Sequence, residues 1–576
     1  MNAERLLALY EKVAEAPDAV PRLRRFVLDL AVRGKLVPQD ADDEPASELL
    51  KRIAAEKARL VKAKAIRKPK AVSPLEPDDL PFPLPRGWAW TQIAELGIIS
   101  PRNEADDTLE ASFVPMPMIA AEYGVVNGHE PRPWGEIKRG YTHFAEGDVG
   151  LAKITPCFEN GKSTVFRNLT GGIGAGTTEL HVVRPLFVDA DYIVLFLKSP
   201  QFIETGIPRM TGTAGQKRVP TEYFNSSPFP LPPLAEQRRI VAKVEELMAL
   251  LDRLEAARTA REATRDRLTA ASLARLTAPD ADSVEFPANA RFALATLPAL
   301  TTRPDQIKPL RQTILNLAVR GKLVDQDPTD EPASELLKRI AAEKARLVKA
   351  GEIRKPRAVQ PLEPDDLPFL LPLGWAWTQI AELGIISPRN EADDTLEASF
   401  VPMPMIAAEY GVANGHEPRL WGEFKKGYTH FAEGDVGLAK ITPCFENGKS
   451  TVFRNLTGGI GAGTTELHVV RPLFVDADYI VLFLKSPQFI ETGVPRMTGT
   501  AGQKRVPTEY FTSSPFPLPP LVEQHRIVAK VDALMALCDR LEAALTTADT
   551  TRARLLEALL QEALDPATEA VTEAAE

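Results

Sequence analysis

The chain repeats itself at an offset of 287 residues, with no insertion or deletion between the two copies. The sequence GWAW occurs at residues 87–90 and again at 374–377. Between Gly87 and Leu234, 142 of 148 positions carry the same residue as their partners in the second copy. The six differing pairs are Val126/Ala413, Pro133/Leu420, Ile137/Phe424, Arg139/Lys426, Ile207/Val494 and Asn225/Thr512. Two copies of one large unit therefore account for nearly the whole chain, which must form the same fold twice.

Each copy begins with a helical region, which we place at residues 1–86 and 303–373. After Asp43 and Pro45, the expected N-cap and first-turn pair, apolar residues recur at helical spacing, for example at Leu49 and Ile53. The proline-rich sequence PLEPDDLPFPLP then ends the helical pattern.

A mixed domain follows at residues 87–233 and 374–520. Short apolar or alternating runs separated by Gly, Asn, Asp and Pro indicate strands, for example TELHVV at 178–183 and YIVLFL at 192–197.

A helical period returns after the mixed domain, with an apolar stripe that includes Ile240, Val244 and Leu247. We expect a coiled-coil-like spacer helix over residues 234–277 and its second copy over 521–564. The remaining segments are interpreted as a linker, 278–302, and a frayed tail, 565–576.

The composition is typical of a soluble globular protein, with 44% hydrophobic and 26% charged residues. No run of about 18 apolar residues occurs, so we expect no contact with a membrane. Three cysteines without CxxC pairing indicate a reducing compartment, and we expect a cytoplasmic protein. The net charge of −9 argues against a nucleic-acid partner only weakly, because a binding groove needs no more than a local basic lining.

No catalytic motif is complete. The GKS at residues 161–163 lacks the glycine of a phosphate-binding P-loop, since Pro156 stands at that position. GGIGAG at 171–176 lacks dinucleotide-binding spacing, and the histidines are too scattered for a zinc site. We therefore expect no catalytic, cofactor-binding or metal-binding residue in this chain. Two modules held apart by helices indicate a binding protein.

Several segments together resemble the specificity subunit of Type I restriction-modification systems. They are LRRFVLDLAVRGKLVPQDADDEPASELLKRIAAEKARLVK, LPxGWAWTQIAEL, GDVGLAKITPCFENGKSTVFRN and PFPLPPLAEQRRIVAKVEELM. The resemblance covers essentially the whole chain, in both copies. It implies an α+β fold in which two mixed α/β target-recognition domains are separated by long antiparallel helices, in a pseudo-two-fold arrangement of the 287-residue repeat.

The resemblance also implies a non-catalytic subunit that binds double-stranded DNA. Such subunits recruit two adenine methyltransferase subunits and usually two restriction subunits, and these partners use S-adenosylmethionine, ATP and Mg²⁺. We expect the methyltransferase contacts around residues 33–35, around 320–322 and at the PLPPL segments that enter the long helices. A helix of fixed length would serve as a ruler between two base-reading modules.

Loops rich in Lys, Arg, Asn, Gln and Thr are the expected DNA contacts, because these side chains reach phosphates and base edges. In the first copy the candidates are Arg102, Asn103, Lys153, Thr155, Asn160, Lys162, Thr213, Gln216, Lys217 and Arg218. In the second copy they are Arg389, Asn390, Lys440, Thr442, Asn447, Lys449, Thr500, Gln503, Lys504 and Arg505. For each residue, a solvated loop position without a DNA role is an equal alternative.

The near identity of the two domains departs from the usual pattern of the family, in which they differ. Identical domains about a pseudo-two-fold axis would read the same half-site on opposite strands, which predicts an interrupted palindrome. Arg139/Lys426 preserves charge, whereas Pro133/Leu420 and Asn225/Thr512 are the pairs to suspect if specificity differs. Two alternatives stay open: a tandem scaffold that binds a protein or a glycan, and an enzyme with its own nuclease or methyltransferase activity.

Overall fold

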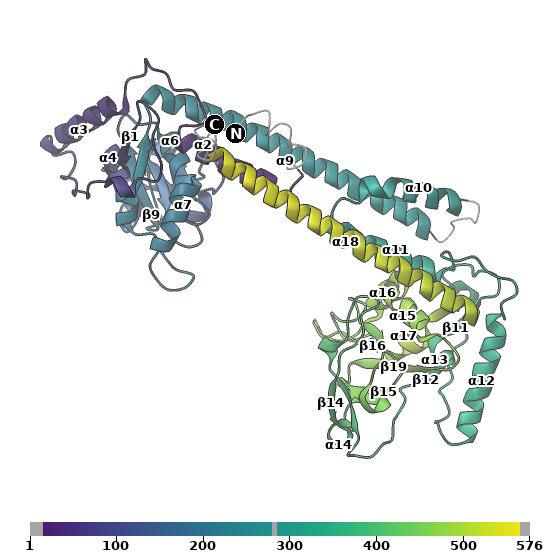
Figure 1. Ribbon diagram of the computed structural model, residues 1–576. Helices are drawn as coiled ribbons and strands as arrows, with labels where there is room; N and C mark the ends of the chain where they lie inside the picture. The colour runs from purple at the N-terminus through teal and green to yellow at the C-terminus, as the bar shows by residue number, and fades with distance from the viewer. Residues whose placement is uncertain (1–14, 279–284, 501, 565–576) are drawn as a thin grey trace. The chain divides into compact units, whose positions relative to one another are not determined.

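The computed structural model describes residues 15–278, 285–500 and 502–564, which divide into two compact units (Figure 1). The first unit comprises the described residues up to Ala260 together with those from Asp549 onward, and the second comprises Arg261–Ala548. Each unit therefore holds one copy of the repeat, completed by the end of the other copy's long helix.

Each unit contains one mixed α/β domain beside helices, which confirms the expected fold class. We name these domains module 1, residues 87–233, and module 2, residues 374–520. The first copy contains α2 (Ala19–Val32), α3 (Ala46–Lys62), β1 (Ala89–Gln92), α4 (Ile93–Leu96), β2 (Gly97–Ile99), β3 (Glu110–Val114), β4 (Glu130–Pro133), α5 (Trp134–Ile137), β5 (Thr142–Ala145), β6 (Val149–Ala152), β7 (Ser163–Val165), β8 (Ile173–Gly176), β9 (Leu180–Pro185), α6 (Ala190–Lys198), α7 (Pro200–Gly206), α8 (Thr221–Ser226), β10 (Pro228–Leu231) and α9 (Leu234–Thr277).

The second copy follows the same order after an additional helix, α10 (Phe286–Leu300). It contains α11 (Ile307–Val319), α12 (Ala333–Lys349), β11 (Ala376–Gln379), α13 (Ile380–Leu383), β12 (Gly384–Ile386), β13 (Glu397–Val401), β14 (Glu417–Leu420), α14 (Trp421–Phe424), β15 (Thr429–Ala432), β16 (Val436–Ala439), β17 (Ser450–Val452), β18 (Ile460–Gly463), β19 (Leu467–Pro472), α15 (Ala477–Lys485), α16 (Pro487–Gly493), α17 (Thr508–Ser513), β20 (Pro515–Leu518) and α18 (Leu521–Leu564).

Three sheets form each module. In module 1, β1 pairs with β10, one four-stranded sheet has the order β2-β9-β6-β7, and another has the order β4-β3-β8-β5. In the last sheet β3 runs parallel to β8, with Phe113 opposite Ala175, and the other pairs are antiparallel. Because β8 leads into β9 through residues 177–179, this turn joins the two larger sheets.

The prediction of a strand at residues 192–197 is wrong, because YIVLFL forms most of helix α6. Asp189 caps this helix by accepting hydrogen bonds from the backbone N–H groups of Asp191 and Tyr192, at 2.9 and 3.3 Å. Every residue of the predicted run is buried. A helix that is apolar on all sides shows no helical period, and its sequence therefore looks like that of a buried strand. The strand predicted from TELHVV is confirmed as β9.

The two long helices have the bounds expected from the sequence, and each has 44 residues. Buried polar side chains fix module 1 to the start of α9. Trp88 Nε1 donates to Glu236 Oε2 at 3.0 Å, and Gln237 Nε2 donates to the carbonyl oxygen of Pro232 at 2.9 Å. Glu236 and Gln237 are 1% and 0% exposed, so these bonds lie inside the junction. Module 2 makes the same bonds with α18.

The helical region is also tied to the long helices by ion pairs. The predicted start of α3 is wrong, because the helix begins at Ala46 with Pro45 as its N-cap and without a capping bond from Asp43. The Asp43 carboxylate binds Arg239 of α9 at 2.7 Å instead. On α2, Arg24 binds Asp252 of α9 at 2.5 Å.

Most of the expected linker, residues 278–302, is helical, because it contains α10. Its Ala293 is buried against Leu273 and Leu276 at the end of α9 and against Leu317 of α11. Apolar packing therefore stabilises a segment whose composition alone indicated a linker. Residues 279–284 and the predicted tail, 565–576, lie outside the described residues.

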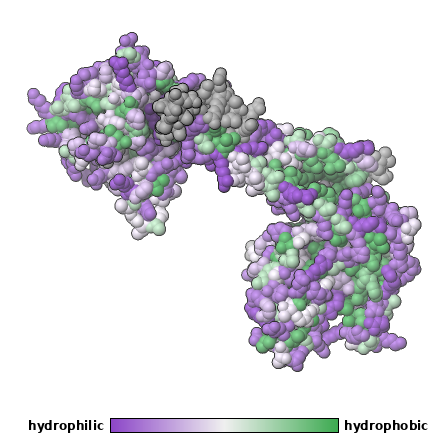
Figure 2. Space-filling model, viewed as in Figure 1, coloured by the Kyte–Doolittle hydropathy of each residue, from purple (hydrophilic) through white to green (hydrophobic). Residues whose placement is uncertain are grey.

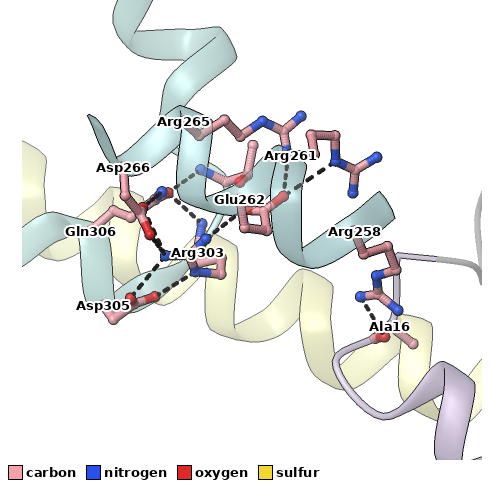
Figure 3. A network of polar contacts seen from close by, with 10 residues as sticks. Ala16, Arg258, Arg261, Glu262, Arg265, Asp266, Arg303, Asp305 and Gln306 are labelled. Carbon is pink, nitrogen blue, oxygen red and sulfur yellow. Dashed lines mark hydrogen bonds and ion pairs between the residues drawn. The ribbon is translucent and has the colours of Figure 1, made fainter. Parts of the chain in front are cut away.

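A polar network fixes the distal part of α9 to the start of the second copy, within the second unit (Figure 3). Arg303 donates to both oxygens of Asp266, at 2.9 and 3.0 Å, and also to Glu262. Gln306 Nε2 donates to Asp266 at 2.8 Å, and Arg265 binds Glu262 at 2.5 Å. α9 therefore contributes to the folding of both units.

No helix in the described ranges has the length and apolarity that a membrane crossing needs. Hydrophilic residues cover most of the visible face of the first unit, with apolar residues scattered among them (Figure 2).

Candidate nucleic-acid interface

A short loop projects from each module between two paired residues. Thr211 and Arg218 exchange backbone hydrogen bonds of 3.0 and 2.8 Å, which close the loop 212–217. All of its residues are exposed. Gly212 has a φ of 125°, and a Cβ there would lie 2.9 Å from the carbonyl oxygen of Gln216. This position therefore requires glycine. Module 2 has the same residue pair at the base of its loop.

The side chain of Arg218 anchors the loop. Its Nη2 binds Glu179 Oε1 at 2.8 Å, and its Nε donates to Glu179 Oε2 at 2.9 Å. This hydrogen bonding holds the pKa of the Glu179 carboxyl below its ordinary value. Arg505 and Glu466 form the same pair in module 2, at 2.8 Å. Arg218 and Arg505, which the sequence suggested as phosphate contacts, thus have guanidinium groups that already bind a carboxylate.

Residues 153–155 form a second segment, which supports the loop through backbone hydrogen bonds. The Thr155 N–H donates to the carbonyl oxygen of Lys217 at 2.9 Å, and the Val219 N–H donates to that of Lys153 at 2.8 Å. The Lys153 N–H donates to the carbonyl oxygen of Glu179 at 3.0 Å. Three segments far apart in the sequence therefore meet at the end of β6 and the start of β9.

A buried histidine, His181, contacts this junction. His181 Nε2 donates to the carbonyl oxygen of Val219 at 3.2 Å, and its ring stacks on Phe224 with centroids 5.0 Å apart. Burial lowers the pKa of His181 to about 4, so the ring is neutral at pH 7. His181 thus supports the loop without adding charge to it.

The predicted contacts at residues 160–162 are held by a buried lysine that sequence reasoning did not identify. Lys198 Nζ donates to the carbonyl oxygens of Gly161 at 3.0 Å, Ala121 at 2.8 Å and Ala120 at 3.3 Å. Burial lowers the pKa of this ammonium to about 7. Lys162 is half-buried, and its ammonium donates to a main-chain carbonyl at 3.4 Å. Lys485 repeats the role of Lys198 in module 2.

The structure does not bring Arg102 and Asn103 to this place. Asn103 Nδ2 donates to the carbonyl oxygen of Phe144 at 2.7 Å, and its Oδ1 accepts from Arg184 at 2.8 Å. Arg184 also binds Asp148, which directly precedes β6, so this network lies at the other end of that strand. Asn390 makes the same contacts in module 2, whereas Arg102 and Arg389 are exposed.

The predicted residues that come together form one surface, which we name the loop face. It comprises residues 153–155, 160–162, 177–179 and 211–218, with the equivalent described residues 440–442, 447–449, 464–466, 498–500 and 502–505. Asn160, Thr213, Gln216 and Lys217 are exposed on it, as are Asn447, Thr500, Gln503 and Lys504. Within the described part of the chain, the side chains of Lys153 and Lys217 have no hydrogen-bond or ion-pair partner, so their charges are available to an anionic ligand.

The described residues bring together no group of three His, Cys, Asp or Glu side chains that could hold a metal ion. The loop face instead presents amide, hydroxyl and ammonium groups on an exposed surface, which is the chemistry that reads DNA.

Comparison with known proteins identifies a family. No family model matches the chain. The Type I restriction enzyme EcoEI specificity subunit of Escherichia coli is 39% identical over 569 residues, which cover 95% of this chain and 94% of the relative. The Type I restriction enzyme EcoAI specificity subunit of Escherichia coli is 40% identical over 565 residues, with the same coverage of both chains.

A comparison with solved structures also gives a match. The HsdS subunit from Thermoanaerobacter tengcongensis matches 84% of this chain and 98% of its own at 20% identity, with a TM-score of 0.42. The alignments with the two Escherichia coli proteins cover 95% of this chain at 39% and 40% identity, which is sufficient to assign the family. The chain belongs to the family of Type I restriction enzyme specificity subunits.

Proposed function

We propose that this chain reads a bipartite DNA site and positions two adenine methyltransferase subunits and two restriction subunits on it, in the cytoplasm. Membership of the family gives the general role: the chain is a non-catalytic DNA-recognition subunit of a Type I restriction-modification system. In the proposal, S-adenosylmethionine, ATP and Mg²⁺ are bound by the partner subunits.

The observation that carries the proposal is the duplication of the loop face. Every loop residue predicted to contact DNA recurs in module 2, and the anchoring ion pair has the same length of 2.8 Å in both modules. Surfaces of the same sequence and shape select the same bases. Two such surfaces on opposite strands would read an interrupted palindrome, with a gap set by the two helices of 44 residues.

The methyltransferase contacts are proposed around residues 33–35 and 320–322. Arg33 and Arg320 lie over the rings of Phe82 and Phe369, at 5.2 and 5.1 Å, so their guanidinium groups are held in place. At the PLPPL segments the prolines are buried, so the accessible residues at the start of the long helices are Ala235 and Arg238 of α9 and Val522 and His525 of α18.

The test is methyl transfer to duplex DNA by the partner methyltransferase, with and without this chain. We expect transfer at discrete sites only when the chain is present. We also expect a footprint of the complex that shows two protected segments around an unprotected gap. Salt-independent binding of a protein or glycan, without any effect on methylation, would favour a scaffold and contradict the proposal.

A further inference from the structure

Three of the six differences between the modules fall within seven consecutive positions, 133–139. They are Pro133/Leu420 at the end of β4, Ile137/Phe424 in α5, and Arg139/Lys426 in the turn before β5. In the second unit, Figure 1 shows β14 and α14 at the end of the module away from α11. Half of the differences between the modules therefore lie at one edge.

This edge borders an open hollow of about 610 Å³ in module 1. Its lining includes Phe113, Arg139, Tyr141, Thr177 and Thr178. Thr177 and Thr178 directly precede Glu179, which anchors the projecting loop. The hollow and the loop therefore share the turn between β8 and β9, and the hollow continues the loop face.

Arg139 differs from the cations beside it. Arg132 binds Glu130 at 2.6 Å and lies 4.2 Å from the centre of the Phe113 ring, and Lys138 binds Asp107. Arg139 is exposed, and no described residue hydrogen-bonds or ion-pairs with its side chain. Lys426 is equally exposed and unpaired among the described residues. The varied position thus carries a free charge at the rim of the hollow.

The difference at Ile137/Phe424 lies directly behind the same hollow. In module 2 the Phe424 ring contacts Phe400, the counterpart of Phe113, with centroids 5.6 Å apart. Phe400 in turn contacts Tyr428 at 5.3 Å and lies under Arg419 at 4.2 Å. Module 1 has an aliphatic side chain at this position, so Phe113, which lines the hollow, lacks this ring contact.

We propose that Arg139 and Lys426 are specificity-determining residues that contact the same base position of the two half-sites. The proposal rests on the DNA-reading function proposed above. An arginine presents a planar fork that binds guanine O6 and N7 together, whereas a lysine presents a single point charge. Both modules therefore prefer guanine at this position, and module 1 requires it more strictly.

The experiment measures methylation by the complete complex of this chain with its methyltransferase subunit. The substrates are target sites in which each base pair is varied in turn, in one half-site or in both. Because the two half-sites are alike, the complex can bind in either orientation and place module 2 on the substituted half-site, so the unaltered chain should tolerate one substituted guanine better than two. Lys426→Arg should strengthen discrimination against singly substituted sites by about 5-fold or more, and Arg139→Lys should relax discrimination against sites substituted in both half-sites. Val126→Ala, another difference between the modules, is the matched control and should change neither.

The outcomes separate this inference from the function on which it rests. Unchanged discrimination in both variants, with chain-dependent methylation intact, would overturn the role of these residues and leave the proposed function standing. A uniform loss of methylation at all bases in Arg139→Lys would indicate a phosphate contact and would also overturn it. Absence of chain-dependent methylation in the unaltered complex would overturn both.

Discussion

Replacing Lys217 and Lys504 by glutamine should change the salt dependence of DNA binding in a calculable way. Both lysines lie on the exposed projecting loops, and the described residues provide neither ammonium group with a partner. Glutamine keeps a polar side chain and removes one positive charge per loop. The fold should be unaffected, because neither side chain packs into the module.

The magnitude follows from the release of counterions. Each phosphate contact contributes about 0.9 to the slope of log affinity against log salt concentration, so removing two contacts lowers the slope by about 1.8. Between about 50 and 200 mM salt, this difference corresponds to a roughly tenfold smaller loss of affinity. The variant should therefore bind much more weakly than the unaltered chain at low salt, and the gap should narrow about tenfold at high salt.

The assay is a titration of fluorescent target duplex with the complex of this chain and its methyltransferase subunit, at five or more salt concentrations. The matched control is Lys51→Gln with Lys338→Gln, which makes the same change in net charge on α3 and α12, outside the loop face. Both control lysines are exposed and pair with a glutamate three residues before them. Equal slopes for the loop variant and the unaltered chain, or an equal drop in the control, would refute the assignment of the loop face to DNA.

Three further predictions concern the projecting loop, the junction of module 1 with α9, and two buried histidines. Gly212→Ala strains a position with positive φ and is expected to lower methylation of the target severalfold. The unfolding midpoint should stay nearly unchanged, because the loop is exposed. A normal methylation rate would contradict this prediction. Trp88→Phe removes a donor from the buried carboxylate of Glu236 and should lower the free energy of unfolding by about 1–3 kcal/mol, measured by chemical denaturation. Burial lowers the pKa of His181 and His468 to about 4, below the ordinary value of 6.5, so the unfolded chain binds more protons between these values. The free energy of unfolding should therefore fall as the pH drops from 6.5 to 4, and a flat profile would show that these rings are accessible to protons.

The order of domains and long helices was predictable because it follows regular sequence patterns. The repeat at an offset of 287 residues indicates two copies of one unit. The apolar period predicts both long helices close to their observed bounds. Strand β9 was predictable from its alternating sequence. Helix α6 was not, because burial on every side removes the period that distinguishes a helix from a strand.

The loop face was predictable only in part. Polar loops rich in glycine indicated residues 211–218 as DNA contacts, but no local pattern showed that Arg218 binds Glu179, 39 residues away. The role of Lys198 is equally invisible in sequence, since an apolar helix end with one lysine gives no sign of three carbonyl acceptors. Such contacts depend on tertiary packing, which places separate segments together.

The central claim is that two equivalent modules read one half-site twice. Single-molecule mapping of N6-methyladenine, in DNA from cells that express this chain with its methyltransferase subunit, tests it most directly. The account predicts a chain-dependent motif whose preferred bases form an interrupted palindrome, methylated on both strands. A bipartite motif with two unrelated half-sites would contradict the equivalence of the modules.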